Sequence, residues 1–173
     1  MTIERHWLTD AIRRRMLPEF QRRGFEIVSL PQPRRGPVDR QFVVSFPFGR
    51  LRRASDRGFE LVEVQLAPRG RAAFRLNFGV IPEVGVATPN GQVTVEDAMV
   101  GWWLDEYYGL YSCPRFRTWF SVPHWPFRKV TESDYEALIE HLIELMPEVE
   151  RALRERKRGP HVRRVGITRK IGT

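Results

Sequence analysis

The sequence has a single cysteine, few histidines and no long apolar run. Cys113 alone excludes an intrachain disulfide and a metal site built from several thiolates, and it fits a reducing compartment. No stretch of about eighteen apolar residues is present, and the opening MTIERHWLTDAIRRR lacks the apolar segment of a secretory signal. These absences predict a cytoplasmic protein that has no membrane partner.

Short motifs of catalysis are also missing. There is no glycine-rich phosphate loop, no dinucleotide fingerprint and no G-x-S-x-G elbow. The four histidines occur singly, without a second ligand at zinc spacing, so we expect neither a metal nor a cofactor. Only His124, which lies in a loop between Pro123 and Trp125, is considered as an acid or base, and a packed or solvated loop histidine is the alternative.

The net charge of +8 is located at one end of the chain. Residues 151–173 contain nine basic residues and one acidic residue, whereas residues 1–150 are formally neutral. This tail suits nonspecific contacts with phosphates, although cations at a helix C-terminus are also favoured by the helix dipole alone. The nucleic-acid candidates in the tail are Arg154, Arg156, Lys157, Arg158, Arg163, Arg164, Arg169 and Lys170.

Hydrophobic periodicity predicts a single α+β domain over residues 1–158, followed by a flexible basic tail over residues 159–173. Apolar residues at helical spacing predict a helix at the N-terminus, interrupted near Pro18, and a last helix with Thr131 or Ser133 as its cap. Residues 49–55, 59–66 and 72–81 alternate and are separated by the turns DRG and PRG, which predicts a meander of three antiparallel strands. Residues 25–30 and the stretch QFVVSFPF are expected to be extended as well.

Residues 100–127 contain ten of the twenty aromatic residues. We predict that a helix from Val95 to Gly109 carries a buried stripe, because its apolar side chains recur at helical spacing, and that this stripe covers the sheet. The alternative is a contact surface for bases or planar ligands at Trp119, Trp125 and Phe127, which basic residues surround.

The wetter face of the meander gathers polar residues. Alternation places Arg52, Glu63, Gln65, Arg75 and Asn77 on this face, where cross-strand pairing is one explanation for them. If a loop covers the face, Arg52 and Arg75, together with His124, become candidates for binding a small anion, because planar guanidinium groups suit carboxylates and phosphates.

Two of these segments resemble a known family. LPEFQRRGF and GRLRRASDRGFELVEVQLAPRGRAAFRLNFGV are similar to the bacterial domain-of-unknown-function family number 4304, over about residues 8–82. The matching residues are Gly24, Phe25, Gln65, Asn77 and Gly79. The resemblance implies an α+β fold with an antiparallel sheet and brings no catalytic residue.

From these features we expect a non-enzymatic binding or protein-interaction module. Its contact would be made by a sheet edge, by the loop from Trp119 to Phe127 or by the tail. The alternatives are a nucleic-acid accessory protein that uses the tail, and an enzyme or binder for a small anionic ligand.

Overall fold

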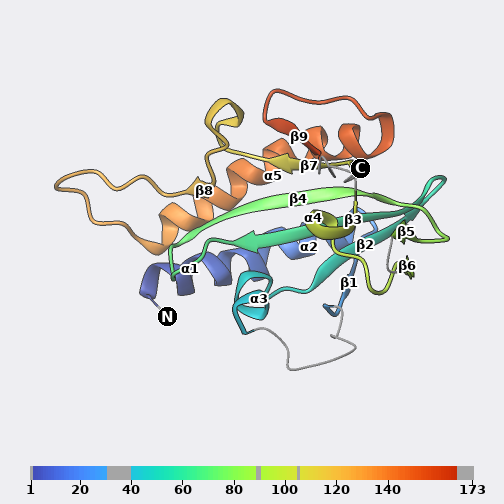
Figure 1. Cartoon of the computed structure of the whole chain (residues 1–173). Helices are drawn as coiled ribbons and strands as arrows, with labels where there is room; N and C mark the ends of the chain where they lie inside the picture. Colours follow the sequence, from blue (N-terminus) through green and yellow to red (C-terminus); the bar gives the residue numbers. More distant parts are fainter. Residues whose placement is uncertain (1, 31–39, 89–90, 105, 167–173) are drawn as a thin grey trace, which may run out of the picture.

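The computed structural model describes residues 2–30, 40–88, 91–104 and 106–166. Within them, one mostly antiparallel sheet of seven strands is covered on one face by long helices, which confirms the predicted α+β class (Figure 1). The strand order is β1(Glu26–Val28), β2(Arg50–Ser55), β3(Gly58–Leu66), β4(Ala73–Ile81), β7(Glu106–Leu110) and β9(Val162–Gly166). In addition, β8(Phe120–Ser121) pairs with β4, and β5(Val86–Thr88) pairs with β6(Gly91–Val93) as a separate hairpin.

The predicted meander is present as β2, β3 and β4. The pairing of β3 with β4 runs from Phe59↔Ile81 to Leu66↔Phe74, so Val62, Val64 and Leu66 share the face under the long helices with Phe74, Leu76 and Phe78. Gly58, the first residue of β3, has φ of 115°, and a Cβ atom there would lie 2.2 Å from the carbonyl oxygen of Ile81. The glycine therefore allows the end of β4 to lie close against the backbone at the start of β3.

The N-terminal helix passes its proline without ending. It consists of α1(Ile3–Ala11), a π-helical turn η1(Ile12–Met16) and α2(Leu17–Arg22), with Pro18 in the first turn of α2. A proline removes one backbone donor and clashes with the carbonyl four residues earlier, and the wider π turn accommodates both effects. The interruption expected near Pro18 is therefore a local widening of the helix.

The last helix, α5(Glu132–Glu155), begins as predicted. Thr131 and Asp134 form a capping box, in which the Asp134 carboxylate accepts a hydrogen bond from the Thr131 backbone N–H at 2.9 Å. Its apolar stripe packs with α1, η1 and α2 against the sheet, and Tyr135 lies beside Trp7 with ring centroids 6.3 Å apart. Of the apolar residues predicted to form the buried stripe of this helix, Leu138 is partly buried. The others are buried, namely Tyr135, Ile139, Leu142, Leu145, Met146, Val149 and Leu153.

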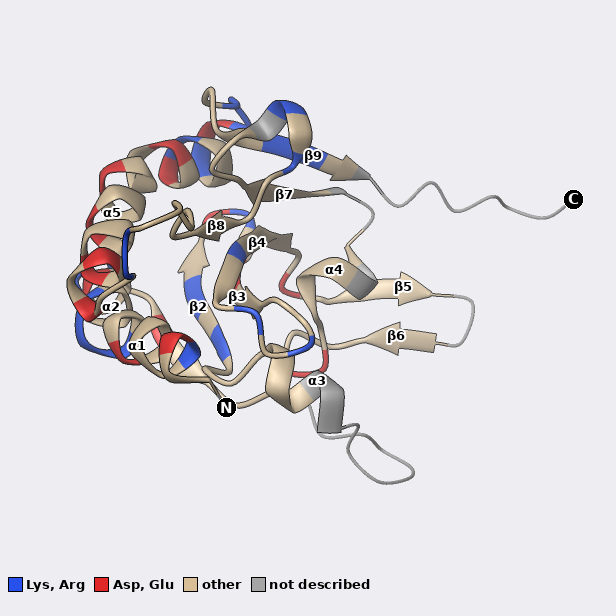
Figure 2. Cartoon of the chain, turned by 90° about the vertical axis from the view of Figure 1, so that its left-hand side faces the viewer, with Lys and Arg blue, Asp and Glu red and all other residues tan. Residues whose placement is uncertain are grey.

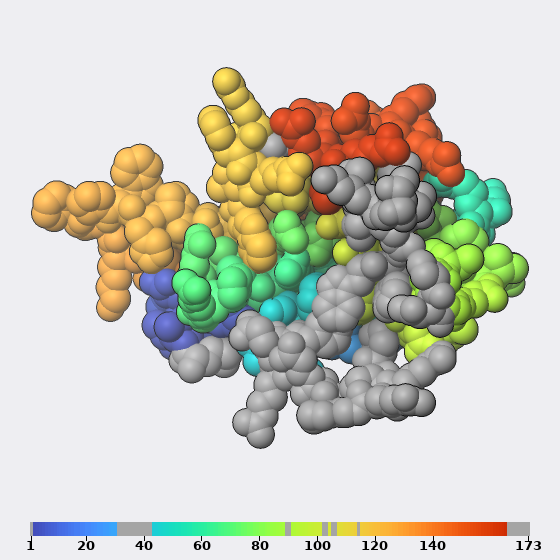
Figure 3. All heavy atoms as spheres, viewed as in Figure 1, coloured from blue at the N-terminus to red at the C-terminus, as the bar shows by residue number. Residues whose placement is uncertain are grey.

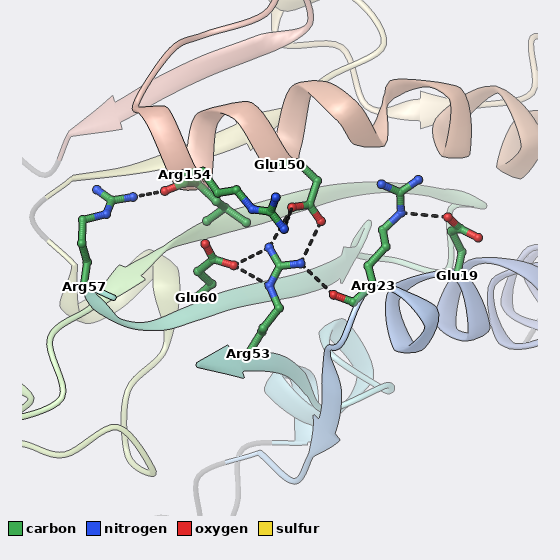
Figure 4. Close-up of polar contacts among 8 residues, drawn as sticks. Glu19, Arg23, Arg53, Arg57, Glu60, Glu150 and Arg154 are labelled. Atoms are coloured by element: carbon green, nitrogen blue, oxygen red, sulfur yellow. Dashed lines mark hydrogen bonds and ion pairs between the residues drawn. The ribbon is translucent and has the colours of Figure 1, made fainter. Parts of the chain in front are cut away.

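An arginine fastens the helix layer to the edge of the sheet (Figure 4). The Arg53 guanidinium donates to Glu60 at 2.7 Å, to both oxygens of Glu150 at 3.0 and 2.8 Å, and to the Arg23 carbonyl at 2.7 Å. Burial lowers the pKa of Arg53, but the hydrogen bonds to the two carboxylates outweigh this effect and raise it. These contacts join β2, β3, α5 and the end of α2.

The stretch QFVVSFPF was wrongly predicted to be extended, because residues 40–45 form the short helix α3(Arg40–Ser45). The sheet edge beside β2 is already occupied by β1, through the pairs Glu26↔Arg52 and Val28↔Arg50. A strand preference reflects the fit to a pleated, half-buried surface, and with β1 paired to β2 this edge of the sheet is not open to residues 40–45. Val43 and Val44 are accordingly exposed.

The helix predicted from Val95 to Gly109 is also wrong. Only α4(Val100–Trp103) is helical, and residues 106–110 form β7, whose Tyr108 pairs with Phe78 of β4. The hydrogen bonds that extend the sheet replace those of the predicted helix, and aromatic residues such as Tyr107 and Tyr108 suit strands. The first part of the aromatic stretch is nevertheless core, since Leu104, Tyr107, Tyr108 and Leu110 are buried.

The prediction of a flexible tail from residue 159 is wrong for its first half. Residues 162–166 form β9, which pairs with β7 from Leu110↔Val162 to Glu106↔Gly166. Val162 is buried against α5 and the sheet, so this strand belongs to the same domain. The rest of the predicted tail, including Arg169 and Lys170, lies outside the described residues.

Candidate functional site

The face of the sheet opposite the long helices is half apolar and half polar. Its apolar half, with Leu61, Ile81 and Tyr107, is covered by Val95, Ala98, Val100 and Leu104 of α4 and the segments beside it. The polar half continues along the same strands, where Glu63 faces Asn77 and Gln65 faces Arg75 in the β3–β4 register. The prediction that the polar residues of this face stand side by side is therefore confirmed for the four on β3 and β4, whereas Arg52 on β2 lies opposite Leu61.

Arg75 is held by neutral groups. Its Nε donates to Gln65 Oε1 at 2.8 Å and its Nη1 donates to the Tyr111 hydroxyl at 3.2 Å. The guanidinium also lies over the Trp119 ring, 4.9 Å from its centroid. Within the described part of the chain no carboxylate lies within 4.0 Å of Arg75, so its charge is oriented without being neutralised.

Gly109 makes this arrangement possible. It pairs with Asn77 in the β4–β7 register, and a Cβ atom at this position would lie 2.7 Å from the Tyr111 ring. Because glycine has no side chain, the buried Tyr111 ring lies across the backbone of β7, and its hydroxyl reaches Arg75. We name Gln65, Arg75, Asn77, Tyr111 and Trp119 the Arg75 cluster.

In the Arg75 cluster, the orientation of the Gln65 amide determines that of the Asn77 amide. Gln65 must turn its oxygen toward Arg75, and this same oxygen accepts from Asn77 Nδ2 at 2.9 Å. Asn77 Oδ1 consequently points elsewhere, and it is buried without a hydrogen-bond partner. A buried acceptor without a donor costs free energy, so this oxygen is an unusual feature of the site.

Glu63 lies on β3 directly opposite Asn77 and is 1% exposed. Its Oε1 accepts from the Val100 N–H at 2.6 Å, and the Gly101 N–H also bonds the carboxylate. Burial raises the pKa of Glu63 to about 7, although these amides and the charge of Arg50 act in the opposite direction. Burial likewise raises the pKa of the neighbouring Tyr107 hydroxyl.

Arg50 of β2 binds the backbone of the segment before α4. Its guanidinium donates to the carbonyl of Val95 at 3.0 Å, to that of Glu96 at 2.7 Å and to that of Ala98. Burial lowers the pKa of Arg50, and the charge of Glu63 partly compensates for this. Together, Arg50 and Glu63 hold residues 95–101 on the sheet from two sides.

The three predicted anion-binding residues lie in different surroundings. Arg52 is paired with Glu26 at 2.7 Å and with Glu96 at 3.5 Å, so its charge is neutralised. His124 lies 3.7 Å from Glu4 in a cleft formed by the start of α1 and the loop before β4. No interaction between described residues joins Arg52, Arg75 and His124 into one pocket, and only Arg75 retains the character expected of an anion site.

The three predicted aromatic contact residues do not form one surface. Trp119 is partly buried against Arg75, whereas Trp125 and Phe127 are 64% and 109% exposed. Sequence reasoning missed Tyr111, whose role depends on the glycine two residues earlier, and Phe116, which is 74% exposed. The pattern Arg-Phe-Arg around Phe116 was the only available signal.

The basic candidates near the end of α5 are partly paired. Arg154 lies 3.3 Å from Glu150, and Lys157 lies 3.0 Å from Glu155. Arg156 ends the helix in a left-handed conformation, with φ of 58°. Arg163 and Arg164 lie on β9 at the edge of the sheet, and Arg158 lies between the two elements.

Searches for similar proteins give no match: no family model, no curated protein and no solved structure matches the chain. The resemblance to family 4304 therefore stays a prediction. No helix among the described residues is long and apolar enough to cross a membrane. The same residues contain no group of three or more His, Cys, Asp or Glu side chains placed to hold a metal ion.

Proposed function

We propose that the protein is a non-enzymatic binding protein that holds an anionic group, a carboxylate or a phosphate, at Arg75. The observation that supports this proposal is a guanidinium fixed by Gln65, Tyr111 and Trp119, with no carboxylate among the described residues within 4.0 Å. A planar fork whose orientation is already fixed loses little conformational entropy when it binds an oxyanion.

Comparison with other arginines supports this assignment. Arg53 is saturated by Glu60 and Glu150, and the exposed Arg14 and Arg15 pair with the acidic side of α5. Arg5 is 4% exposed and donates only to backbone carbonyls, so its role is to join loops. Arg75 differs from all of these because its described partners are side chains without charge, and none of their hydrogen bonds uses its Nη2 atom.

Binding without chemistry fits the neighbours of Arg75. A nucleophile or a free base would be needed beside a bound substrate for acyl or phosphoryl transfer. Glu63, the acid on this face with a raised pKa, lies opposite Asn77 in the strand pair, and its Oε1 accepts the Val100 N–H of α4. The bound anion is a free small molecule or a carboxylate of a protein partner, and a chain with one cysteine, Cys113, is compatible with binding in a reducing compartment such as the cytoplasm.

Thermal unfolding in the presence of anions tests the proposal. Acetate, inorganic phosphate and a short peptide with a free C-terminus are compared with sodium chloride at equal ionic strength and with the same peptide as its amide. A ligand at ten times its Kd stabilises by about 1.4 kcal/mol, which raises the Tm of a domain of this size by roughly 3 to 5 °C. We expect this rise for at least one anion with the wild-type protein.

Two variants separate the site from general charge effects. Arg75→Gln should abolish the rise, whereas Arg71→Gln, which removes an exposed arginine before β4, should keep it. Stabilisation by the free peptide alone indicates a protein carboxylate as the source, and stabilisation by acetate or phosphate indicates a small ligand. Equal responses of both variants, or no response of the wild-type protein to any anion, would refute the assignment.

A further inference from the structure

The second part of the aromatic stretch forms two turns that stand out from the body of the molecule. The first lies between β7 and β8 and includes η2(Pro114–Phe116), and the second connects β8 to α5 (Figure 1). Both are visible in the space-filling view as projections, one yellow and one orange (Figure 3). We name residues 115–117 and 125–129 the two tips.

Each tip is closed by a backbone hydrogen bond, and its aromatic rings are exposed to solvent. The first is closed by the bridge Cys113↔Thr118, in which the Thr118 N–H donates to the Cys113 carbonyl at 3.0 Å. The second is closed by the Arg128 N–H, which donates to the Trp125 carbonyl at 3.3 Å. The rings of Phe116, Trp125 and Phe127 nevertheless remain 74%, 64% and 109% exposed.

Each tip also contains a strained residue. Arg117 has φ of 51° and Phe127 has φ of 71°, a left-handed region that non-glycine residues rarely adopt. Such a conformation costs about 1 kcal/mol or more, and no packing of the Phe127 ring compensates for it. Folding alone therefore gives no reason for an aromatic side chain at this position.

The charge of the tips has one sign. Residues 112–130 contain four basic residues and no acidic residue. No carboxylate of the described residues lies within 4.0 Å of Arg115, Arg117 or Lys129, whereas Arg128 pairs with Asp134. Arg115 lies over the Phe116 ring, 5.6 Å from its centroid, so cation and ring are presented together.

A second basic segment lies beside the first tip. The Tyr111 N–H donates to the His161 carbonyl at 3.1 Å, which brings the base of this turn next to the segment between α5 and β9. Residues 154–164 contain six basic residues and one acidic residue. Figure 2 shows blue on β9, on the residues that follow α5 and on the neighbouring turn.

We propose that the two tips and the adjoining basic segment bind single-stranded nucleic acid, independently of the anion site at Arg75. Exposed aromatic rings can stack on bases, and only unpaired bases offer a free face. The cations of the first tip lie beside the basic segment that follows α5, and such a row of charges matches a flexible chain of phosphates better than one isolated acidic group. The rings supply stacking energy, and the arginines supply the electrostatic attraction.

Fluorescence anisotropy of labelled oligonucleotides tests this proposal. Full-length protein is titrated with a dT 20-mer, an rU 20-mer and a matched duplex at several salt concentrations. We expect both single strands to bind at least tenfold more tightly than the duplex at physiological salt. A tip variant, Phe116→Ser with Trp125→Ser and Phe127→Ser, should weaken single-strand binding by at least tenfold, because each stacked base contributes substantially to affinity.

Control variants separate stacking from charge and from folding. Val84→Ser removes another exposed apolar side chain, on the β4–β5 turn, and should leave binding unchanged. Arg115→Gln with Arg117→Gln should reduce the slope of log K against log salt by about 1.4, since each phosphate contact contributes about 0.7 for single strands. Circular dichroism and Tm should match the wild-type protein for every variant, because all these side chains are exposed.

Four results would overturn the proposal. Equal affinities for single strand and duplex, or equal affinities of the wild-type protein and the tip variant, would show that the rings do not stack on bases. Absence of oligonucleotide binding even at 50 mM salt would remove nucleic acid as the partner. Tip-dependent sedimentation with anionic lipid vesicles, without oligonucleotide binding, would assign the tips to a membrane surface instead.

Discussion

The buried carboxylate of Glu63 makes stability depend on pH in an unusual direction. Its pKa is raised from 4.5 to about 7 in the folded protein, mainly by burial. The folded state therefore binds the proton more tightly than the unfolded state does. The contribution of Glu63 is most favourable below pH 4.5, is lost as pH rises toward 7, and stays constant above that value.

The magnitude follows from the shift. A pKa difference of one between the folded and unfolded states corresponds to about 1.4 kcal/mol of stability. The change from 4.5 to about 7 therefore corresponds to about 3 kcal/mol, of which about 2.5 kcal/mol is lost between pH 5 and pH 8. Glu63→Gln keeps the size of the side chain and an oxygen that accepts from Val100, but it carries no charge at any pH. The free energy of unfolding of the variant minus that of the wild-type protein should therefore increase by about 2 to 3 kcal/mol as pH rises from 5 to 8.

Guanidinium unfolding followed by tryptophan fluorescence at pH 5, 6, 7 and 8 measures this difference. The informative quantity is the pH dependence of the difference in unfolding free energy between the variant and the wild-type protein. A difference that is the same at every pH arises from the new amide group and not from protonation of Glu63. Glu83→Gln, an exposed carboxylate after β4, serves as the matched control and should show no such change. If the difference for Glu63→Gln varies by less than about 0.5 kcal/mol from pH 5 to pH 8, burial does not hold a proton on Glu63.

Two further substitutions test the scaffold and the site. Arg53→Met should lower the free energy of unfolding by about 3 to 5 kcal/mol, because it leaves the buried carboxylate of Glu60 without its partner and that of Glu150 with Arg154 alone, and chemical denaturation measures this loss. Gly109→Ala should weaken anion binding by at least tenfold, measured by calorimetry with the anion that gives the largest Tm rise, because its Cβ atom displaces the Tyr111 ring from Arg75.

Elements that rest on local patterns could be predicted from the sequence. The meander and α5 have strong periodicity and their own turn or cap residues, such as Gly58 and Thr131, so their chain segments specify them without knowledge of the rest. The same alternation placed Gln65, Arg75 and Asn77 on one face. In a strand, a side chain's face depends only on whether its number is odd or even.

Elements that depend on distant partners could not be predicted. Residues 106–110 form a strand because β4 and β9 flank them, and residues 162–166 form one because β7 does. Nothing in the local sequence of either segment indicates its partner. Arg53 likewise lies on the apolar face of β2, where alternation predicts a core residue, and its acceptor Glu150 follows ninety-seven residues later.

The pairing of β9 with β7 has a consequence for synthesis of the chain. About fifty residues separate Leu110 from Val162, and at 5 to 20 residues per second a ribosome needs roughly 3 to 10 seconds to make them. During this time β7 has a partner on its β4 side only, and its other edge is free to pair with any extended segment nearby. The nascent chain is therefore most exposed to misassembly after its core strands have formed, and the arrival of β9 ends that interval.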